Sequence, residues 1–116
     1  MGSESPTQRS MKLLRQRGYT ARIVEYFLAP ANKRIDLFGF GDILACKVGE
    51  TGSLIVQTTT ASHISDRIKK AEALDAYRVW LMCGNKVEFH GWKKDLKTNR
   101  WVCRIEHGDL SPLDMV

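Results

Sequence analysis

The spacing of apolar residues along the chain changes between helical and alternating patterns. Helical spacing predicts a short helix over residues 7–17 and a long helix over about residues 62–82. Ser62 is the expected N-cap of the long helix, and Gly84 can take the left-handed position after its end. The apolar stripe of this helix consists of Ile64, Ile68, Ala71, Leu74, Tyr77 and Leu81. The segment 79–82 is equally compatible with a strand, and the pattern leaves both interpretations open.

The short helix has a small apolar patch and a basic exposed face. Thr7 or Ser10 is its expected N-cap, and Gly18 is its expected end. The patch consists of Met11, Leu13 and Leu14, and the exposed face carries Arg9, Lys12, Arg15 and Arg17.

Five segments are predicted to be strands because they are rich in β-formers or alternate between apolar and polar residues. They are residues 19–28, 42–48, 53–59, 87–92 and 101–105. Residues 49–52 are expected to form the turn between the second and third strands, and residues 93–100 to join the last two as a hairpin. The predicted order is helix, three strands, helix and two strands, which indicates an α/β layer with a mixed sheet.

The length of 116 residues is enough for one compact domain and too small for two. We expect a single domain over residues 7–110, between a flexible N-terminus at 1–6 and a C-terminal tail at 111–116. The longest unbroken apolar run has five residues, Val79–Cys83, whereas a transmembrane helix needs about 20. Since the first residues also lack the apolar stretch of a secretory signal, no membrane partner is expected.

The chain has three cysteines, an odd number, and none of them forms a C-x-x-C pair. This pattern argues against a disulfide framework or a zinc knuckle and favours a reducing cytoplasm. Cys46, Cys83 and Cys103 all lie in apolar stretches, so buried free thiols are expected.

The formal net charge of +5 is unevenly distributed along the chain. Residues 1–34 carry +5 and residues 84–105 carry +4, whereas residues 35–60 carry −2 and residues 106–116 carry −3. Basic flanks around an acidic centre suit a polyanionic partner bound around a cation site. An ordinary solvated basic surface explains the same counts equally well.

Candidate chemistry lies in the second and third predicted strands. If residues 49–52 form a four-residue turn, Leu44 lies opposite Gln57 and Asp42 lies opposite Thr59. Opposed residues share a face of the sheet, and that face repeats every second residue. Asp42, Gln57 and Thr59 would then project together as a set of oxygen ligands, which suits Mg²⁺ or Mn²⁺ better than zinc.

The pattern Gly41-Asp42-Ile43-Leu44-Ala45 followed by Val56-Gln57-Thr58-Thr59 resembles the PD-(D/E)XK nuclease fold. The similarity is to the branch that includes archaeal Holliday-junction resolvases and small phage-encoded nucleases, and it spans roughly residues 7–92. It implies a restriction-endonuclease-like mixed sheet, in which a motif aspartate opens the second strand and Glu-x-Lys follows on the third. It also implies a metal-dependent endodeoxyribonuclease that acts on DNA, including branched DNA, in the cytoplasm of a prokaryotic or phage-infected cell.

The sequence departs from this motif at two positions. Gln57 stands where the acidic ligand is expected, and Thr59 stands where the lysine is expected. Glu25 and Asp36 are candidates for the missing metal-ligating carboxylate. The candidates for the missing cation, all on the long helix, are Lys70, Lys69 and Arg67.

Nucleic-acid contacts are expected from both basic flanks and from the long helix. The candidate residues are Arg15, Arg17, Arg67, Lys69, Lys93 and Lys94. Trp92 and Trp101 flank the basic hairpin, where they either stack on bases or pack across the strands. His63 either contacts a phosphate or is a plain surface residue.

Three functions remain open at this stage. The first is the metal-dependent nuclease, for which analogy suggests a homodimer. The second is a catalytically weak or inactive nucleic-acid-binding module on the same fold, which the two motif departures favour. The third is an accessory protein that binds a host protein through the acidic residues Glu106, Asp109 and Asp114.

Overall fold

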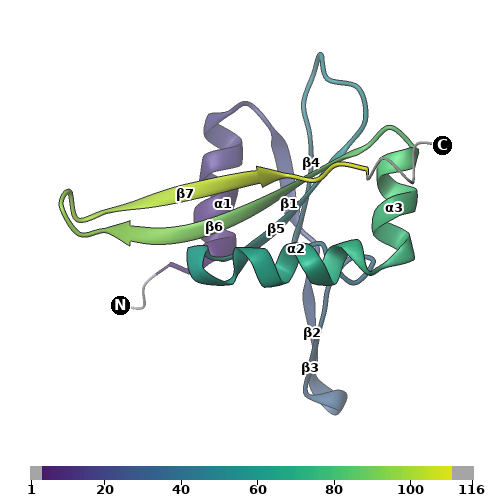
Figure 1. Cartoon of the computed structure of the whole chain (residues 1–116), viewed down its shortest axis with the longest axis horizontal. Helices are drawn as coiled ribbons and strands as arrows, with labels where there is room; N and C mark the ends of the chain where they lie inside the picture. Colours follow the sequence, from purple (N-terminus) through teal and green to yellow (C-terminus); the bar gives the residue numbers. More distant parts are fainter. Residues whose placement is uncertain (1–3, 111–116) are drawn as a thin grey trace.

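The computed structural model describes residues 4–110 of the chain. A five-stranded mixed sheet forms its centre, with α1 on one face and α2 and α3 on the other (Figure 1). The elements in chain order are α1 (Pro6–Gln16), β1 (Thr20–Ile23), β2 (Tyr26–Leu28), η1 (Ala29–Ala31), β3 (Lys33–Ile35), β4 (Ile43–Cys46), β5 (Leu54–Thr60), η2 (Ala61–His63), α2 (Ile64–Glu72), α3 (Asp75–Met82), β6 (Lys86–Asp95) and β7 (Arg100–His107).

The strand order in the sheet is β1-β4-β5-β6-β7. The pairs β1–β4, β4–β5 and β6–β7 are antiparallel, whereas β5 and β6 are parallel and are joined by the crossover through α2 and α3. The expected α/β class with a mixed sheet is therefore confirmed. The predicted first strand is divided, because β2 leaves the sheet and pairs only with β3 in a separate hairpin.

Helix α1 begins two residues earlier than its expected cap positions allow. Ser5, rather than Thr7 or Ser10, is the N-cap: its hydroxyl accepts a hydrogen bond from the Gln8 amide, and the Gln8 side chain accepts one from the Ser5 amide. This reciprocal pair satisfies two of the free amide donors at the helix start. Gly18 ends the helix with a positive φ of 89°, as expected.

The register of the β4–β5 hairpin differs from the predicted one by two residues. Ile43 pairs with Val56, and Leu44 pairs with Ile55 instead of Gln57. The cause is the start of β5: Ser53 makes its backbone hydrogen bonds to Asn85 and Lys86 beside β6, and not to the β4 side. The loop between the strands is therefore longer than the four residues expected. Because a shift of two is one full side-chain period, the faces of both strands are retained.

The predicted long helix is two helices. The chain leaves the helical path at Leu74, whose extended backbone (φ −93°, ψ 130°) makes it the N-cap of α3. This break lets Leu74 pack beside Gly39, against the apolar residues that lie under α2 and α3. His63, and not Ser62, occupies the N-cap position of α2. The alternative strand at residues 79–82 is helical in the structure.

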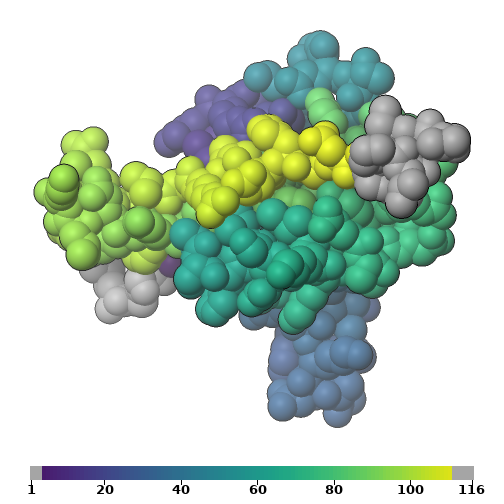
Figure 2. Space-filling view, viewed as in Figure 1, coloured from purple at the N-terminus to yellow at the C-terminus, as the bar shows by residue number. Residues whose placement is uncertain are grey.

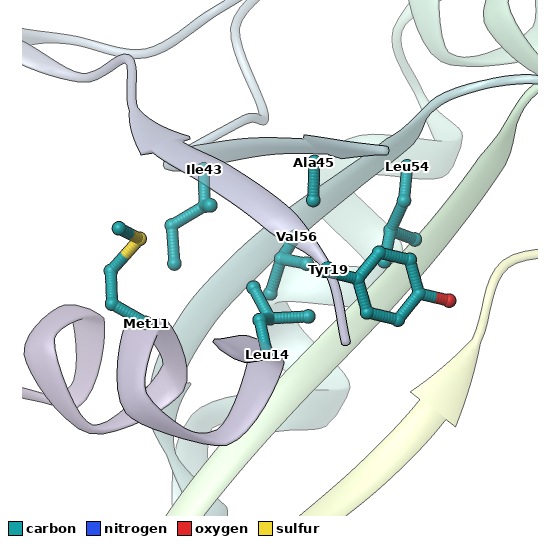
Figure 3. Close-up of a cluster of buried hydrophobic side chains, with 7 residues drawn as sticks. All are labelled: Met11, Leu14, Tyr19, Ile43, Ala45, Leu54 and Val56. Atoms are coloured by element: carbon teal, nitrogen blue, oxygen red, sulfur yellow. The ribbon is translucent and has the colours of Figure 1, made fainter. Parts of the chain in front are cut away.

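Two apolar clusters lie on opposite faces of the sheet. The cluster under α1 contains Met11, Leu14, Tyr19, Ile43, Ala45, Leu54 and Val56 (Figure 3). The cluster under α2 and α3 contains Phe40, Ile55, Ile64, Ala71, Tyr77, Val87 and Phe89. The expectation of buried thiols is wrong: Cys46 at the end of β4 and Cys83 after α3 are exposed, and Cys103 on the edge strand β7 is half-buried.

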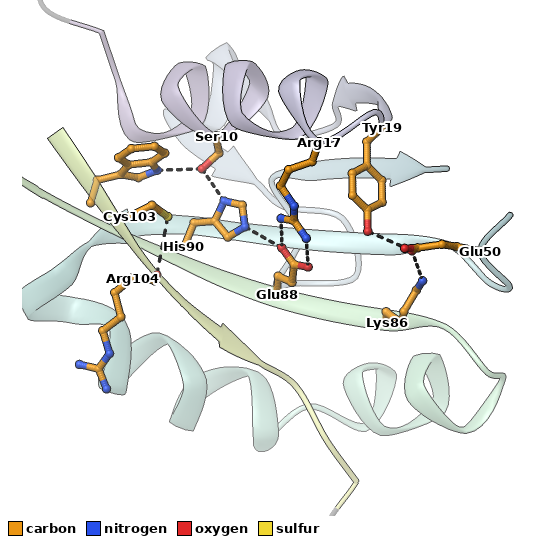
Figure 4. A network of polar contacts seen from close by, with 10 residues as sticks. Ser10, Arg17, Tyr19, Glu50, Lys86, Glu88, His90, Cys103 and Arg104 are labelled. Atoms are coloured by element: carbon orange, nitrogen blue, oxygen red, sulfur yellow. Dashed lines mark hydrogen bonds and ion pairs between the residues drawn. The ribbon is translucent and has the colours of Figure 1, made fainter. Parts of the chain in front are cut away.

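A polar network also joins α1 to strand β6 (Figure 4). Arg17 donates two hydrogen bonds to the Glu88 carboxylate, at 2.8 and 2.9 Å. His90 lies between Glu88 (Nε2 to Oε1, 2.9 Å) and Ser10 (Nδ1 to Oγ, 2.8 Å), and Ser10 also accepts a hydrogen bond from the Trp92 indole. Ser10 and His90 are fully buried, and this chain of contacts holds the helix on the sheet. Its other end, at Arg17 and Glu88, lines a surface pocket.

Burial alone would raise the pKa of Glu88, but the hydrogen bonds from Arg17 and His90 outweigh it and lower that pKa to about 2. We therefore expect Glu88→Ala to lower the free energy of unfolding by about 2–4 kcal/mol, because it leaves Arg17 and His90 without their acceptor. Chemical denaturation at pH 7 measures this. The matched control is Glu106→Ala, which removes an exposed pair with Arg104 and should cost about 0.5 kcal/mol or less.

The lowered pKa of Glu88 also defines the pH range in which this residue stabilises the protein. The contribution of Glu88 is fully present above its ordinary pKa of 4.5 and is lost as pH falls towards about 2. The difference in stability between the parent protein and Glu88→Ala should therefore shrink below pH 4.5. A difference that stays constant from pH 7 to pH 3 would contradict this assignment.

Candidate functional site

Three carboxylates from separate segments meet beside the start of β4. Glu25 follows β1, Asp36 follows β3, and Asp42 immediately precedes β4. One ligand oxygen from each lies within 4.8 Å of the others. Asp42, Asp36 and Glu25 are three of the four residues that the sequence offered as metal ligands.

The backbone explains this convergence. The Asp42 carbonyl accepts hydrogen bonds from the amides of Val24 and Glu25, at 2.9 and 3.4 Å, which ties the end of β1 to the start of β4. Leu37 and Gly41 exchange two backbone hydrogen bonds, at 2.8 and 2.9 Å. This tight loop brings Asp36 back beside Asp42, and it requires positive φ values at Phe38 (55°) and Gly39 (86°).

Asp42 is held by β5 and is almost completely buried, with 5% of its surface exposed. Its Oδ2 accepts hydrogen bonds from the Thr58 amide (2.7 Å) and the Thr58 hydroxyl (3.2 Å). The Thr58 hydroxyl lies 2.8 Å from that of Thr7 on α1, and Thr7 also donates to Glu25 at 3.3 Å. Two threonine hydroxyls therefore link the helix, the middle strand and two of the three carboxylates.

The electrostatics of the cluster are unfavourable when every carboxylate is charged. Burial, followed by the hydrogen bond and charge of Glu25 and the charge of Asp36, raises the pKa of Asp42 to about 8. Burial and the charge of Glu25 also raise the pKa of Asp36. Like charges that share a desolvated site favour protonation or a bound cation.

The carboxylates open into a pocket of about 310 Å³. Arg34, at the end of the β2–β3 hairpin, and Arg67, on α2, contribute positive charge to its lining. Arg34 Nη1 lies 3.8 Å from Glu25 Oε2. The remaining lining residues are Ser5, Pro6, Thr7, Thr58, Thr59, Thr60 and His63. The pocket therefore combines carboxylate and hydroxyl oxygens with two guanidinium groups.

The structure places the other predicted site residues in different surroundings. Thr59 lines the pocket, as expected for a residue of the site. Gln57 is buried in β5 and is not among the residues that line the pocket in the described part of the chain. Lys69 and Lys70 are exposed on α2, and Arg67 is the residue of this helix that reaches the lining.

Thr58 was missed by sequence reasoning. The assumed four-residue turn placed Asp42 opposite Thr59, whereas the Asp42 carboxylate accepts its hydrogen bonds from Thr58. The signal that could have corrected this was Gly49 together with Gly52, since both take positive φ values in the longer loop.

The predicted nucleic-acid contacts differ in availability. Arg15 is exposed on α1, and Lys93 and Lys94 are exposed on β6 towards its hairpin with β7. Arg17 is bound in a bidentate pair to Glu88, and the carboxylate neutralises its charge.

The two candidate tryptophans also separate. Trp92 is 9% exposed and donates to Ser10, so it is a packing residue of the α1 face. Trp101 is 42% exposed and carries the Arg9 guanidinium 4.0 Å from its ring centroid. His63 lines the pocket and contacts the Thr60 hydroxyl through Nδ1 at 2.9 Å.

The donor set of the pocket fits a hard divalent cation. Mg²⁺ and Mn²⁺ prefer carboxylate oxygens, and the three carboxylates supply them from a partly desolvated site. Such an ion would be held by Asp42, Asp36 and Glu25, and would offset the burial and the repulsion that together raise the pKa of Asp42.

The chain matches no model of a known protein family, no curated protein and no solved structure. Among residues 4–110, none of the helices combines the length and the apolar character needed to span a membrane. The interpretation of the site therefore depends on the geometry and chemistry described above.

The raised pKa of Asp42 predicts how stability depends on pH without metal. In the folded state the carboxyl keeps its proton up to about pH 8, whereas its ordinary pKa is 3.8. Stability in EDTA should therefore fall as pH rises from about 4 to 8. Asp42→Asn should remove this loss and stabilise the protein at pH 9 by on the order of 2 kcal/mol. Thermal unfolding across this pH range measures the effect.

The matched control is Asp66→Asn, which changes an exposed carboxylate on α2. It should leave the pH dependence of the parent protein unchanged. Addition of Mg²⁺ at pH 8 should raise the unfolding midpoint of the parent and of the control, but not that of Asp42→Asn. If Asp42→Asn is no more stable than the parent at pH 9, the repulsion is too weak to define a cation site.

Proposed function

We propose that this protein is a metal-dependent endodeoxyribonuclease of the PD-(D/E)XK type, with the restriction-endonuclease-like arrangement of that fold. The observation that carries the proposal is the convergence of Glu25, Asp36 and Asp42 within 4.8 Å at the start of β4. The motif aspartate, Asp42, is the most buried of the three. Building such a cluster costs stability, and a bound Mg²⁺ or Mn²⁺ recovers that cost.

The chemistry of phosphodiester hydrolysis explains the composition of the pocket. The metal ion would lower the pKa of a bound water and neutralise charge on the scissile phosphate. Thr58 fixes the orientation of Asp42 through two hydrogen bonds. Arg34 and Arg67 would bind phosphate oxygens from opposite segments of the pocket, where guanidinium groups form paired hydrogen bonds with phosphate.

Arg67 is the strongest candidate for the cation that the motif lysine would supply. Thr59 occupies the motif position and lines the pocket, but it carries no charge. Arg67 lines the same pocket from α2, whereas the side chains of Lys69 and Lys70 are exposed elsewhere on that helix. A cation that has moved from the strand to the neighbouring helix serves the same electrostatic purpose.

A second function, a nucleic-acid-binding module without catalysis, is favoured by one specific observation. Guanidinium groups are poor proton acceptors, and the described lining of the pocket contains two arginines and no lysine. The proposed partners are DNA and a second copy of this chain, and the proposed location is the cytoplasm. A host-protein partner would use the acidic end, of which Asp114 lies outside the described residues.

Cleavage assays separate these functions. Plasmid and branched DNA should be cleaved in Mg²⁺ or Mn²⁺ and left intact in EDTA. Asp42→Ala should lower the rate at least about a hundredfold, because it removes the central ligand of the proposed ion. Asp66→Ala, an exposed change on α2, should leave the rate within about twofold of the parent.

The same assay identifies the cation. Arg67→Ala should lower the rate by about tenfold or more, and by more than Lys70→Ala. Cleavage that survives Asp42→Ala unchanged would remove the proposed site. Binding of DNA without cleavage in either metal would establish the module in place of the nuclease.

Binding of DNA should weaken steeply as salt is added, because the exposed basic groups release counterions from the phosphates they contact. The double change Lys93→Ala and Lys94→Ala should reduce the slope of log affinity against log salt by about 1.8. Titration of labelled duplex in EDTA measures this slope. Arg78→Ala, on α3 and paired with Asp75, is the control and should leave the slope unchanged. An affinity for DNA that does not change between low and moderate salt would contradict binding through these exposed basic groups.

A further inference from the structure

The β2–β3 hairpin projects from the body of the protein as a separate arm (Figures 1 and 2). The arm comprises residues 26–35, with η1 at its tip. Its first strand is largely exposed although it is apolar: Tyr26 is 58%, Phe27 59% and Leu28 41% exposed. A surface aromatic pair on a projecting arm is costly in water and indicates a binding role.

The arm is attached to the candidate site at both of its ends. Glu25 immediately precedes the arm, and Asp36 immediately follows it. A ligand that contacts the base of the arm therefore lies next to two of the three clustered carboxylates.

The register of the arm places an aromatic ring beside a pocket residue. Phe27 pairs directly with Arg34, so the two side chains share a face of the hairpin. Arg34 lines the pocket and approaches Glu25. Phe27 is thus an exposed ring directly opposite a pocket residue on this face.

We infer that the arm is a base-stacking element that gives the site a preference for DNA with unpaired bases, with Phe27 stacking on a base whose backbone is held by Arg34. This inference rests on the proposed function, because it places the substrate of the same pocket. Aromatic rings bind unpaired bases without regard to sequence, and in a continuous duplex both faces of each base are already stacked. Single strands, gaps and branch points therefore fit the arm, and uninterrupted duplex does not.

Charge favours nucleic acid over another occupant. The arm contains Lys33 and Arg34 and no acidic residue. Lys33 and Arg34 are exposed beside the aromatic strand, so a polyanion can contact cations and rings together. A second copy of this chain would bring an identical positive arm, and a lipid surface would not account for the attachment of the arm to the carboxylate pocket.

The test compares binding of three labelled DNAs of equal length in EDTA: a single strand, a gapped duplex and a continuous duplex. Phe27→Ala should weaken binding of the single strand and the gapped duplex about tenfold, and should change binding of the continuous duplex by less than twofold. Phe27→Tyr should retain the preference for the single strand and the gapped duplex over the continuous duplex. Phe27→Leu should lose this preference, because stacking requires an aromatic ring and an aliphatic side chain cannot replace it. Val48→Ala, at a fully exposed site in the β4–β5 loop, is the control and should bind as the parent does.

The outcomes are decisive in each direction. Equal effects of Phe27→Ala on all three DNAs, no effect on any of them, or full retention by Phe27→Leu would overturn the stacking role. Binding of anionic phospholipid vesicles that Phe27→Ala abolishes, or dissociation of a dimer by the same change, would assign the arm to those partners and overturn it as well. Because EDTA prevents cleavage, a preference for unpaired bases that depends on Phe27 is valid even if the protein is inactive as a nuclease. Conversely, if the protein cleaves DNA but lacks this preference, the stacking role of the arm is wrong and the proposed nuclease function is retained.

Discussion

The candidate site depends on the position of α1 against the sheet. One stripe of this helix, spaced three or four residues apart, carries Thr7, Ser10, Leu14 and Arg17 against the sheet. Ser10 and Arg17 fix the helix to β6 through the His90–Glu88 network. With the helix fixed, the Thr7 hydroxyl reaches Thr58, which in turn holds Asp42 in the pocket. A rotation of α1 would therefore disturb the carboxylate cluster although no residue of the network touches it.

The pKa values of two buried acids in this protein shift in opposite directions. This contrast separates an acid that stabilises the fold from an acid that is a candidate for chemistry. Glu88 is paired with Arg17 and His90, and its pKa falls to about 2 despite its burial. Asp42 is buried and faces Glu25 and Asp36, and burial together with these two acids raises its pKa to about 8. The fold thus satisfies one acid with its own side chains and leaves the other among like charges. Acids that a fold places in this second condition, next to an open pocket, are candidates for chemistry because the missing countercharge must come from outside.

The sequence predicted the elements well wherever one periodicity was sustained. The first helix, β5, and the β6–β7 hairpin were found because apolar spacing continued through each of them. The predictions that were wrong depended on contacts between distant segments. The hydrogen bonds of Ser53 to Asn85 and Lys86 set the β4–β5 register, and the packing of Leu74 beside Gly39 divided the long helix. All three acids of the cluster were candidates from the sequence. The role of Thr58 and the pairing of Arg17 with Glu88 could not be predicted, because they depend on which strands and helices are neighbours in the fold.

The motif departures at Gln57 and Thr59 acquire a physical explanation from the placement of charge around the pocket. A glutamate at position 57 would add a carboxylate to a strand that is buried along nearly its whole length, where its charge would be desolvated. Glu25 and Asp36 instead approach from the ends of strands, where they remain half-exposed and cost less to ionise. The same argument applies to the cation, since Thr59 is 7% exposed whereas Arg67 reaches the pocket from an exposed helix face. In the proposed nuclease the charged groups of the motif would lie around the interior strand instead of on it. The two arginines that line the pocket, one of them near the base of the aromatic arm, would then contact the polyanionic backbone.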